Sequence, residues 1–204
     1  SRRNAESLVD SVKEQGVQSG DQLIIYLTAH GIVDADGNAF LLCDDFDVDK
    51  QSRTRVLIND LLDELSNCDA ATKILILNAG QIDYDPRLGV FVNDFPERLK
   101  AAVEQCGDSS LWVYCSHQSL QYSQVSHAVQ RSIFGLFIAE GLKGAADIDQ
   151  NRDVDLRELA LFTSANVASW VQQLSAGVAR QDPILLRASE ASFTPLPTLV
   201  TLDP

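Results

Sequence analysis

The sequence predicts a three-layer α/β/α sandwich, in which helices cover both faces of a mostly parallel sheet. Continuous apolar runs at residues 23–28, 73–79 and 111–115 are typical of strands that are buried on both faces. Segments with helical spacing of apolar residues alternate with these runs, and this alternation indicates a parallel sheet. In such sheets the functional site lies at the carboxyl ends of the strands, so the residues after each run are the first candidates.

Local patterns place the elements of the first half. An apolar stripe predicts a helix over residues 4–15, before the first apolar run. The Asp36-Gly37 pair predicts the turn of a hairpin over 32–43. Asn59 is a favourable N-cap residue, and it predicts the start of a helix that runs to about residue 65.

The second half continues the alternation. In chain order it predicts a loop at 81–93, a helix at 95–105, a polar loop at 116–130, helices at 131–142 and 156–174, and a last strand at 183–187. Residues 1–190 then form one domain, and the Pro-containing residues 191–204 form an extended C-terminal tail.

Composition and charge exclude several classes of function. With 204 residues, 45% of them hydrophobic and 22% charged, the chain is typical of a folded globular domain. A net charge of −13 argues against nucleic-acid binding, which needs clustered Lys and Arg, and it favours cationic partners, including Ca²⁺. No apolar run approaches the ~20 residues that a membrane helix needs. The four cysteines lack metal-type spacing, which favours a reducing, cytoplasmic setting.

Two of the apolar runs end in residues that bear on chemistry. The first ends in His30-Gly31, and a histidine at a strand end can act as a general base. The second ends in Asn78-Ala79-Gly80, which carries no nucleophile. The alternative for His30 is a lone histidine that closes a strand without any catalytic role.

The order of several motifs resembles the caspase-like cysteine peptidases, in particular their bacterial and metacaspase-like branch. The resemblance covers nearly the whole chain. It lies in the strand ending in His-Gly at 21–31, the hairpin at 34–42, the Leu-Asn-Ala-Gly at 77–80, the helix and acidic loop at 132–142 and 144–147, and the Arg-Gln-Asp-Pro at 180–183.

The resemblance implies a degenerate active site. In that family a cysteine thiolate attacks the scissile carbonyl and a histidine handles the protons. His30 matches the histidine, while Gly80 stands at the nucleophile position and has no side chain. Asn78 stands where metacaspase-like members keep an acidic residue that binds a basic substrate side chain, and Gln81-Ile82 also depart from the pattern. The implied function is an inactive, pseudo-peptidase domain that serves as a binding or scaffold module.

An active peptidase with a displaced thiol is the competing interpretation. No cysteine lies between Cys68 and Cys106, so a shift in alignment does not restore the nucleophile. Cys115 ends the third apolar run and His117 follows two residues later, so the pair would share a face if the strand continued. A buried structural thiol is the other interpretation of Cys115.

An acidic segment has the ligand spacing of an EF-hand Ca²⁺ loop. Its oxygen side chains fall at positions 1, 3, 5, 7, 9 and 12 of a twelve-residue window: Asp147, Asp149, Asn151, Asp153, Asp155 and Glu158. Arg152 stands at the sixth position, where a glycine normally adopts a positive φ. An acidic surface turn that caps the following helix is the alternative. A Ca²⁺-responsive regulatory domain is therefore a third function class, compatible with the first.

The resemblance also implies missing elements at the front. The family's sheet begins with two strands before the region that matches Ser1. Without them the strand at 23–28 would expose an apolar edge, which proteins seldom leave uncovered. We therefore expect a protein or peptide partner, with the missing strands supplied either by an upstream part of the same protein or by another chain.

Overall fold

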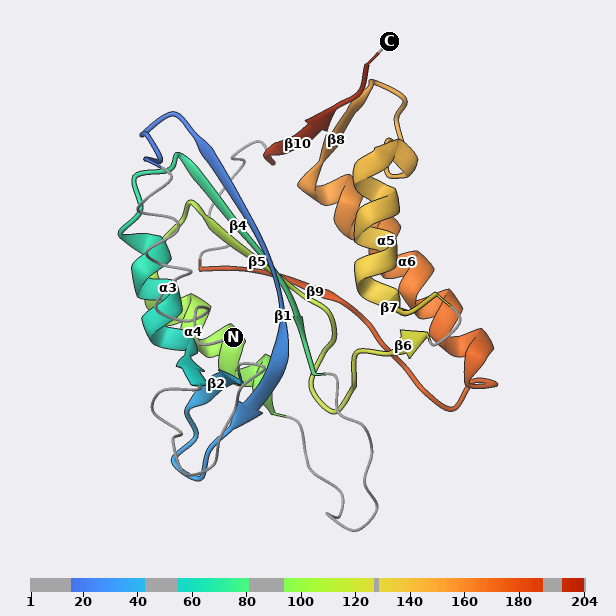
Figure 1. The fold of residues 1–204 in the computed structure, drawn as a ribbon, viewed down its shortest axis with the longest axis horizontal. Coiled ribbons are helices and arrows are strands. Elements are labelled where there is room, and N and C mark those ends of the chain that lie inside the picture. Colours follow the sequence, from blue (N-terminus) through green and yellow to red (C-terminus); the bar gives the residue numbers. More distant parts are fainter. Residues whose placement is uncertain (1–15, 43–54, 81–93, 127–128, 189–195, 204) are drawn as a thin grey trace.

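A computed structural model describes residues 16–42, 55–80, 94–126, 129–188 and 196–203 (Figure 1). The helix expected at 4–15 and the loop expected at 81–93 lie outside the described residues, as do Cys43 and the Gln81-Ile82 pair.

A six-stranded sheet forms the centre of the fold. Its order is β3-β2-β1-β4-β5-β9, with β1, β4 and β5 parallel and β9 antiparallel to β5. The strands are β1 (Gln22–Val33), β2 (Ala39–Leu42), β3 (Arg55–Leu57), β4 (Thr72–Ala79), β5 (Leu111–Cys115) and β9 (Ile184–Arg187). The hairpin predicted at the Asp36-Gly37 turn is present, because β2 pairs antiparallel with the end of β1. The predicted sandwich with its mostly parallel sheet is thus confirmed.

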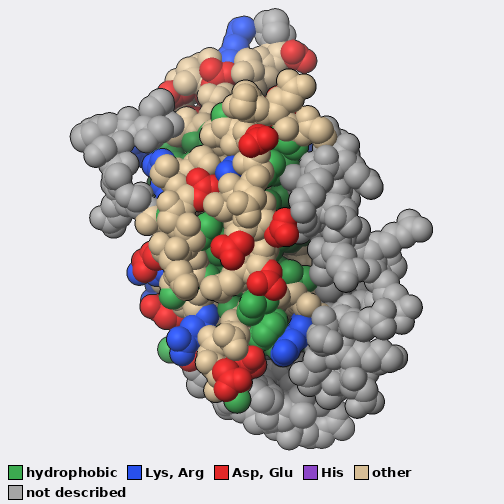
Figure 2. Space-filling model, turned by 90° about the vertical axis from the view of Figure 1, so that its left-hand side faces the viewer, with side chains coloured by type: hydrophobic (Ala, Val, Ile, Leu, Met, Phe, Trp, Pro, Cys, Tyr) green, Lys and Arg blue, Asp and Glu red, His purple; other side chains and the backbone are tan. Residues whose placement is uncertain are grey.

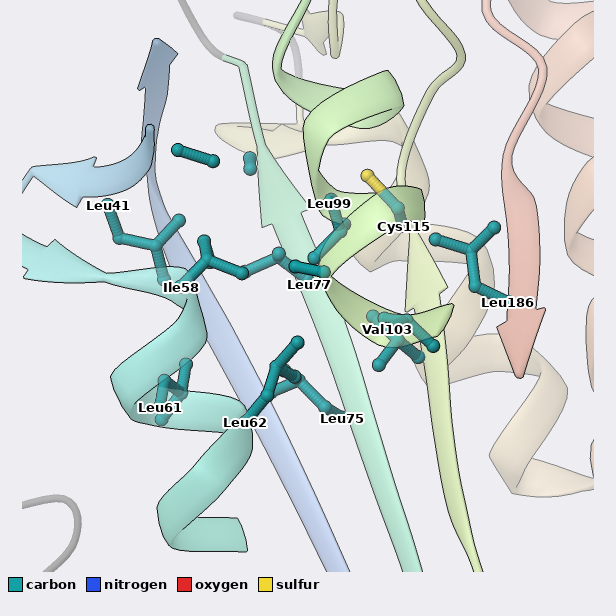
Figure 3. Packing of buried hydrophobic residues seen from close by; sticks show 14 of the residues in the cluster. Leu41, Ile58, Leu61, Leu62, Leu75, Leu77, Leu99, Val103, Cys115 and Leu186 are labelled. Atoms are coloured by element: carbon teal, nitrogen blue, oxygen red, sulfur yellow. The ribbon is translucent and has the colours of Figure 1, made fainter. Parts of the chain in front are cut away.

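One helical layer packs on the sheet through α3 (Ile58–Ser66) and α4 (Phe95–Cys106). Leucines of α3 meet the alternate residues Leu75 and Leu77 of β4 in a buried cluster (Figure 3). Because successive strand residues face opposite sides, Ile74 and Ile76 are left for the other face. Figure 2 looks onto this layer, where Asp and Glu side chains are spread over the exposed surface.

The second layer consists of α5 (Ile133–Glu140), a π-helical turn η3 (Gly141–Ala145) and α6 (Leu156–Leu174). Helices α5 and α6 pack against each other on the opposite side of the sheet from α3 and α4 (Figure 1). Tyr114 of β5 is fully buried here; it packs edge-on against Phe134 and donates its hydroxyl hydrogen bond to the carbonyl of Ala160.

Two predicted helix starts differ from the structure. Asn59 is not the N-cap of α3, because Leu57 holds that position in extended geometry and makes no side-chain cap. The chain enters α3 directly from strand β3, so the cap position falls on a strand residue. The helix predicted from residue 131 begins instead at Ile133 with Ser132 as its N-cap, whose hydroxyl accepts from the backbone N–H of Gly135.

The loop expected at 116–130 and the tail expected at 191–204 both contain strands. Strand β6 (Val125–Ser126) pairs with β7 (Arg131–Ser132), which leads into α5. Strand β10 (Thr198–Thr201) pairs with β8 (Asp153–Asp155) inside the acidic segment. The pairing of β10 with β8 joins residues distant in sequence, and periodicity within either segment alone does not indicate it. Strands β6 and β7 have two residues each, which is too short for a periodic pattern.

The outer edge of β1 is open among the described residues. Gln22–Ala29 pair with β4 on one side, whereas β2 reaches only the last four residues of the strand, from His30 onward. Two large apolar side chains on this strand stay exposed, Ile24 at 40% and Tyr26 at 44%. An exposed apolar edge is a natural place for another strand to add.

Candidate functional site

The two predicted site positions are neighbours at the carboxyl ends of β1 and β4. Ala29 lies opposite Ala79 in the parallel register, so His30 and Gly80 follow at the next position of each strand. Adjacent strands are about 4.8 Å apart. The imidazole of His30 is exposed. His30 and Thr28 lie on the same face of the sheet. Gly80 and Asn78 lie on this face too, at the end of the neighbouring strand.

Gly80 has neither the backbone geometry nor the space for a side chain. Its φ of +103° lies in the region that favours glycine. A Cβ atom built on Gly80 would lie 2.7 Å from Nε2 of His117, and closer still to Cε1 of the same ring. The imidazole of His117 therefore fills the volume that a nucleophilic side chain at this position would need.

His117 is a site residue whose place the sequence did not indicate. It lies two residues after the end of β5 at Cys115, and it is 0% exposed. The hydroxyl of Ser116 lies 3.0 Å from its Nδ1 and donates to the carbonyl of Ala79. Burial lowers the pKa of His117 to about 4, because a charged imidazole would lose its hydration there.

Asn78 forms a buried hydrogen-bond network next to Gly80. The amide is 1% exposed; Nδ2 donates to the hydroxyl of Ser132 at 2.8 Å, and Oδ1 accepts from the hydroxyl of Ser123 at 2.7 Å. The Asn78 side chain therefore ties the strand end to two later segments. The amide is neutral, so Asn78 adds no charge at the end of β4.

Hydrogen bonds hold the segment from Ser116 to Gln124 at the carboxyl end of β4. Gln181 is 0% exposed; its amide donates to the carbonyl of Ser116, and it accepts from the backbone N–H of Gln124. The backbone N–H of Ser123 also donates to the carbonyl of Gly80. In the sequence, Gln181 is only one residue of the Arg-Gln-Asp-Pro motif, and these contacts explain why a buried glutamine precedes the last strand.

The Cys115 and His117 side chains have different surroundings, which differs from the shared face that a longer strand would give them. Strand β5 ends at Cys115, so the alternation that would align the two side chains does not continue. The Cys115 side chain lies in the apolar cluster under α4 (Figure 3), whereas His117 lies against Gly80. Burial raises the pKa of the Cys115 thiol to about 11, which disfavours the thiolate.

A groove of about 460 Å³ runs beside this site between β1 and α5. Its walls are mainly apolar, and Asn78 and Ser132 lie at its polar end. The described lining residues are Ile24, Tyr26, Thr28, Ile76, Asn78, Arg131, Ser132, Gly135, Ile138, Ala139 and Leu142.

The acidic segment brings together three of its six predicted ligands. Carboxylate oxygens of Asp147, Asp149 and Glu158 lie within 4.8 Å of one another. One oxygen of Asp147, Oδ1, is buried without a hydrogen-bond partner among the described residues. Arg152 has a φ of +72°, so the sixth position adopts the positive φ that the EF-hand pattern requires.

The other predicted ligands have structural tasks. Asp155 is the N-cap of α6 and forms a capping box with Glu158, whose carboxylate also accepts from the backbone of Ile148. Asp153 accepts from the hydroxyl of Thr201 on β10, and Asn151 donates to Asp149. The helix-capping alternative is therefore realised, and a metal ion would have to share Glu158 with backbone N–H groups.

The fold is similar to that of a solved caspase. The crystal structure of caspase-1 from Spodoptera frugiperda matches with a TM-score of 0.55 and 14% identity, over 90% of this chain and 68% of that chain. The chain thus has a caspase-like fold. A scan against protein-family models and a search of curated proteins find no match. A membrane-spanning helix is not found among the described residues.

Proposed function

We propose that the protein is a catalytically inactive, caspase-like pseudo-peptidase domain of the bacterial, metacaspase-like kind, and that it serves as a binding or scaffold module. The observation that carries this proposal is the contact between His117 and Gly80. It supports an inactive site, because the His117 ring occupies the space that a nucleophilic side chain at position 80 would need.

The remaining contacts support the same proposal. Asn78 is committed to Ser132 and Ser123, so it serves to hold segments together and not to bind a basic substrate group. Gly80, which follows β4 at the position adjacent to the exposed His30, offers no nucleophilic side chain. A module of this kind keeps the strand-end site and can hold a peptide without cleaving it.

We expect no hydrolysis of fluorogenic peptides that end in Arg, Lys or Asp, with or without Ca²⁺. Covalent catalysis requires a nucleophile within reach of a base, and the buried Cys115 thiol offers neither access nor a low pKa. The measurement is fluorescence release by the purified protein, with a Cys115→Ser variant alongside. Peptide hydrolysis would establish the displaced-thiol peptidase instead, provided that iodoacetamide abolishes it and that the Cys115→Ser variant does not show it.

The partner that we propose supplies strands to the open edge of β1. No described strand pairs with the outer side of Gln22–Ala29, and this open side and the exposed Ile24 and Tyr26 support the placement. An upstream part of the same protein and a separate chain remain the two sources. Native mass spectrometry of the material from its own cell distinguishes them, and a stable, soluble monomer of these residues alone would contradict the proposal.

Ca²⁺ regulation through the acidic segment is a second candidate function, favoured by the buried, unpartnered Oδ1 of Asp147. Asp147, Asp149 and Glu158 would hold the ion, since hard oxygen ligands are those that Ca²⁺ prefers. Arg152 adds a positive charge beside these carboxylates, which weakens the attraction for a cation.

We expect calorimetry to detect weak Ca²⁺ binding, with a dissociation constant on the order of 10⁻⁴ M. Glu158→Gln removes a carboxylate ligand but keeps the capping box, which accepts Gln at this position. Binding heat should therefore vanish while the unfolding temperature in the absence of Ca²⁺ changes little. Glu140→Gln, on α5, is the matched control. Equal heats for wild type and Glu158→Gln would contradict the site.

A reducing, cytoplasmic location completes the proposal. The three described cysteines, Cys68, Cys106 and Cys115, are free thiols, which supports a compartment where disulfides do not form. Thiol counting on protein trapped with alkylating reagent inside its own cell tests this location, and a disulfide found there would contradict it.

A further inference from the structure

The C-terminal strand β10 is bonded to the acidic segment at three points, beside strand β8 (Figure 1). The backbone N–H of Leu202 donates to the carbonyl of Arg152 at 2.7 Å, and the hydroxyl of Thr201 donates to the carboxylate of Asp153 at 2.6 Å. Just before the strand, the carbonyl of Pro197 accepts from the first backbone N–H of α6. The strand therefore holds the second half of the EF-hand pattern, from its sixth to its tenth position.

Apolar contacts extend this attachment to the turn that precedes the acidic segment. A Cβ atom built on Gly144 of η3 would lie 2.9 Å from Cδ1 of Leu202, so the Leu202 side chain covers this glycine. Leu199 and Val200 pack against the buried cluster under α5 and α6. Strand β10 thus contacts the chain on both sides of the three clustered carboxylates.

The register of the pairing decides where the backbone of Asp153 points. Leu202 donates to Arg152, so the neighbouring pair of Thr201 and Asp153 is the one that exchanges no backbone hydrogen bonds. In an antiparallel ladder the N–H and C=O of such a residue both point away from the partner strand. The N–H of Asp153 agrees with this, because it donates to Oδ1 of Asn151 within the acidic segment. The Asp153 carbonyl therefore points to that side as well.

This orientation matches a ligand position of the EF-hand pattern. The seventh position of that pattern supplies a backbone carbonyl, and Asp153 holds it. The carboxylates of Asp147, Asp149 and Glu158 lie within 4.8 Å of one another, and the buried Oδ1 of Asp147 has no hydrogen-bond partner among the described residues. A cation between these carboxylates satisfies that oxygen. The strand that orients the seventh position thus bears on how well the segment holds a cation.

We propose that the pairing of β10 with β8 completes the Ca²⁺ site of the acidic segment, and that bound Ca²⁺ in turn holds β10 in place. The inference rests on the second candidate function, Ca²⁺ binding, and names the element that responds to the ion. Coupling between two sites is reciprocal, so the ion and the strand strengthen each other's binding by the same factor. Residues 196–203 are then the part of the chain through which Ca²⁺ is sensed.

Hydrogen exchange measures one side of this coupling. We expect saturating Ca²⁺ to slow amide exchange in a peptide that covers residues 196–203 by roughly tenfold, which lies in the usual range for coupled sites. The Glu158→Gln variant lacks a carboxylate ligand and should show no such slowing. Unchanged exchange in residues 196–203, at a Ca²⁺ concentration where calorimetry shows binding to the wild type, would overturn the inference.

Proline variants measure the other side. Leu202→Pro removes the N–H that donates to Arg152, so calorimetry should show roughly tenfold weaker Ca²⁺ binding. Asp203→Pro is the matched control, because the alternation of the ladder turns the N–H of this next residue away from β8, and its affinity should equal that of the wild type. The exchange measurement needs no change in β10, so it decides the matter even where Leu202→Pro does not fold.

The outcomes separate the coupling from the Ca²⁺ site itself. Equal Ca²⁺ affinity in the wild type and in a folded Leu202→Pro variant would overturn the inference and leave Ca²⁺ binding standing. Absence of binding heat in the wild type would overturn the second candidate function and the coupling with it. Slower exchange in residues 196–203 together with weaker binding by Leu202→Pro would support both.

Discussion

Replacing Gly80 by cysteine is expected to destabilise the protein by roughly 3 kcal/mol and to restore no peptidase activity. Two costs add. A side chain at φ +103° costs about 1–2 kcal/mol of backbone strain. Its Cβ also meets the His117 ring, which is 0% exposed and cannot swing into solvent, and such overpacking costs about 1–3 kcal/mol. Urea unfolding and a peptide-cleavage assay measure the two outcomes.

Matched variants separate the two costs. Gly177 has a φ of +83° and nothing within 4 Å of a Cβ, so Gly177→Ala should show the backbone cost alone, about 1 kcal/mol. Combining Gly80→Cys with His117→Ala opens space, so the double variant should lose less stability than the sum of the single changes. A Gly80→Cys protein of wild-type stability that cleaves peptides would refute both the steric account and the pseudo-peptidase proposal.

The sequence predicted the elements whose pattern is strong over many residues. The apolar runs of β4 and β5 needed no partner to be recognised, because a strand buried on both faces is continuously apolar. The helix α6 was predicted at its observed bounds from the spacing of its apolar residues. The capping box that Asp155 and Glu158 form at its start agrees with this start. The positions of His30 and Gly80 followed in turn, because the ends of parallel strands meet at one edge.

Local sequence pattern could not predict the contacts that decide the chemistry of the site. His117 meets Gly80 only because β5 lies beside β4 and then turns, and nothing near either residue encodes that meeting. Gln181 reaches Ser116 and Gln124 across the strand ends in the same way. The alternative in which Cys115 and His117 share a face depended on a longer strand in a related way, since it needed two more strand residues than β5 has.

The acidic segment illustrates how one spacing serves two purposes. Glu158 is the twelfth residue of the EF-hand pattern and also the third helical residue of a capping box. Sequence alone left both interpretations open. The hydrogen bonds establish the cap, while the unpartnered oxygen of Asp147 keeps the metal proposal open to calorimetry.

We expect the protein to lose up to about 3 kcal/mol of stability on acidification from pH 6.5 to pH 4 because of His117 alone. Burial depresses the pKa of His117 from 6.5 to about 4 in the folded state. Between these values the unfolded chain binds a proton that the folded protein does not, so the unfolded state gains as pH falls. The contribution is fully present above pH 6.5 and its loss is complete near pH 4, at about 1.4 kcal/mol for each pKa unit.

The difference between wild type and His117→Gln isolates this effect from the many carboxylates that also titrate in acid. Gln stays neutral at every pH, so its stability relative to wild type should improve steadily as pH falls from 6.5 toward 4, whatever its fixed packing cost. His30→Gln is the matched control, because it removes an exposed imidazole of the same site in place of a buried one. Urea midpoints at several pH values give both differences. A His117→Gln difference that is constant with pH would mean that the ring is hydrated or charged in the folded protein. In that case His117 would not be the neutral, buried group that fills the space beside Gly80.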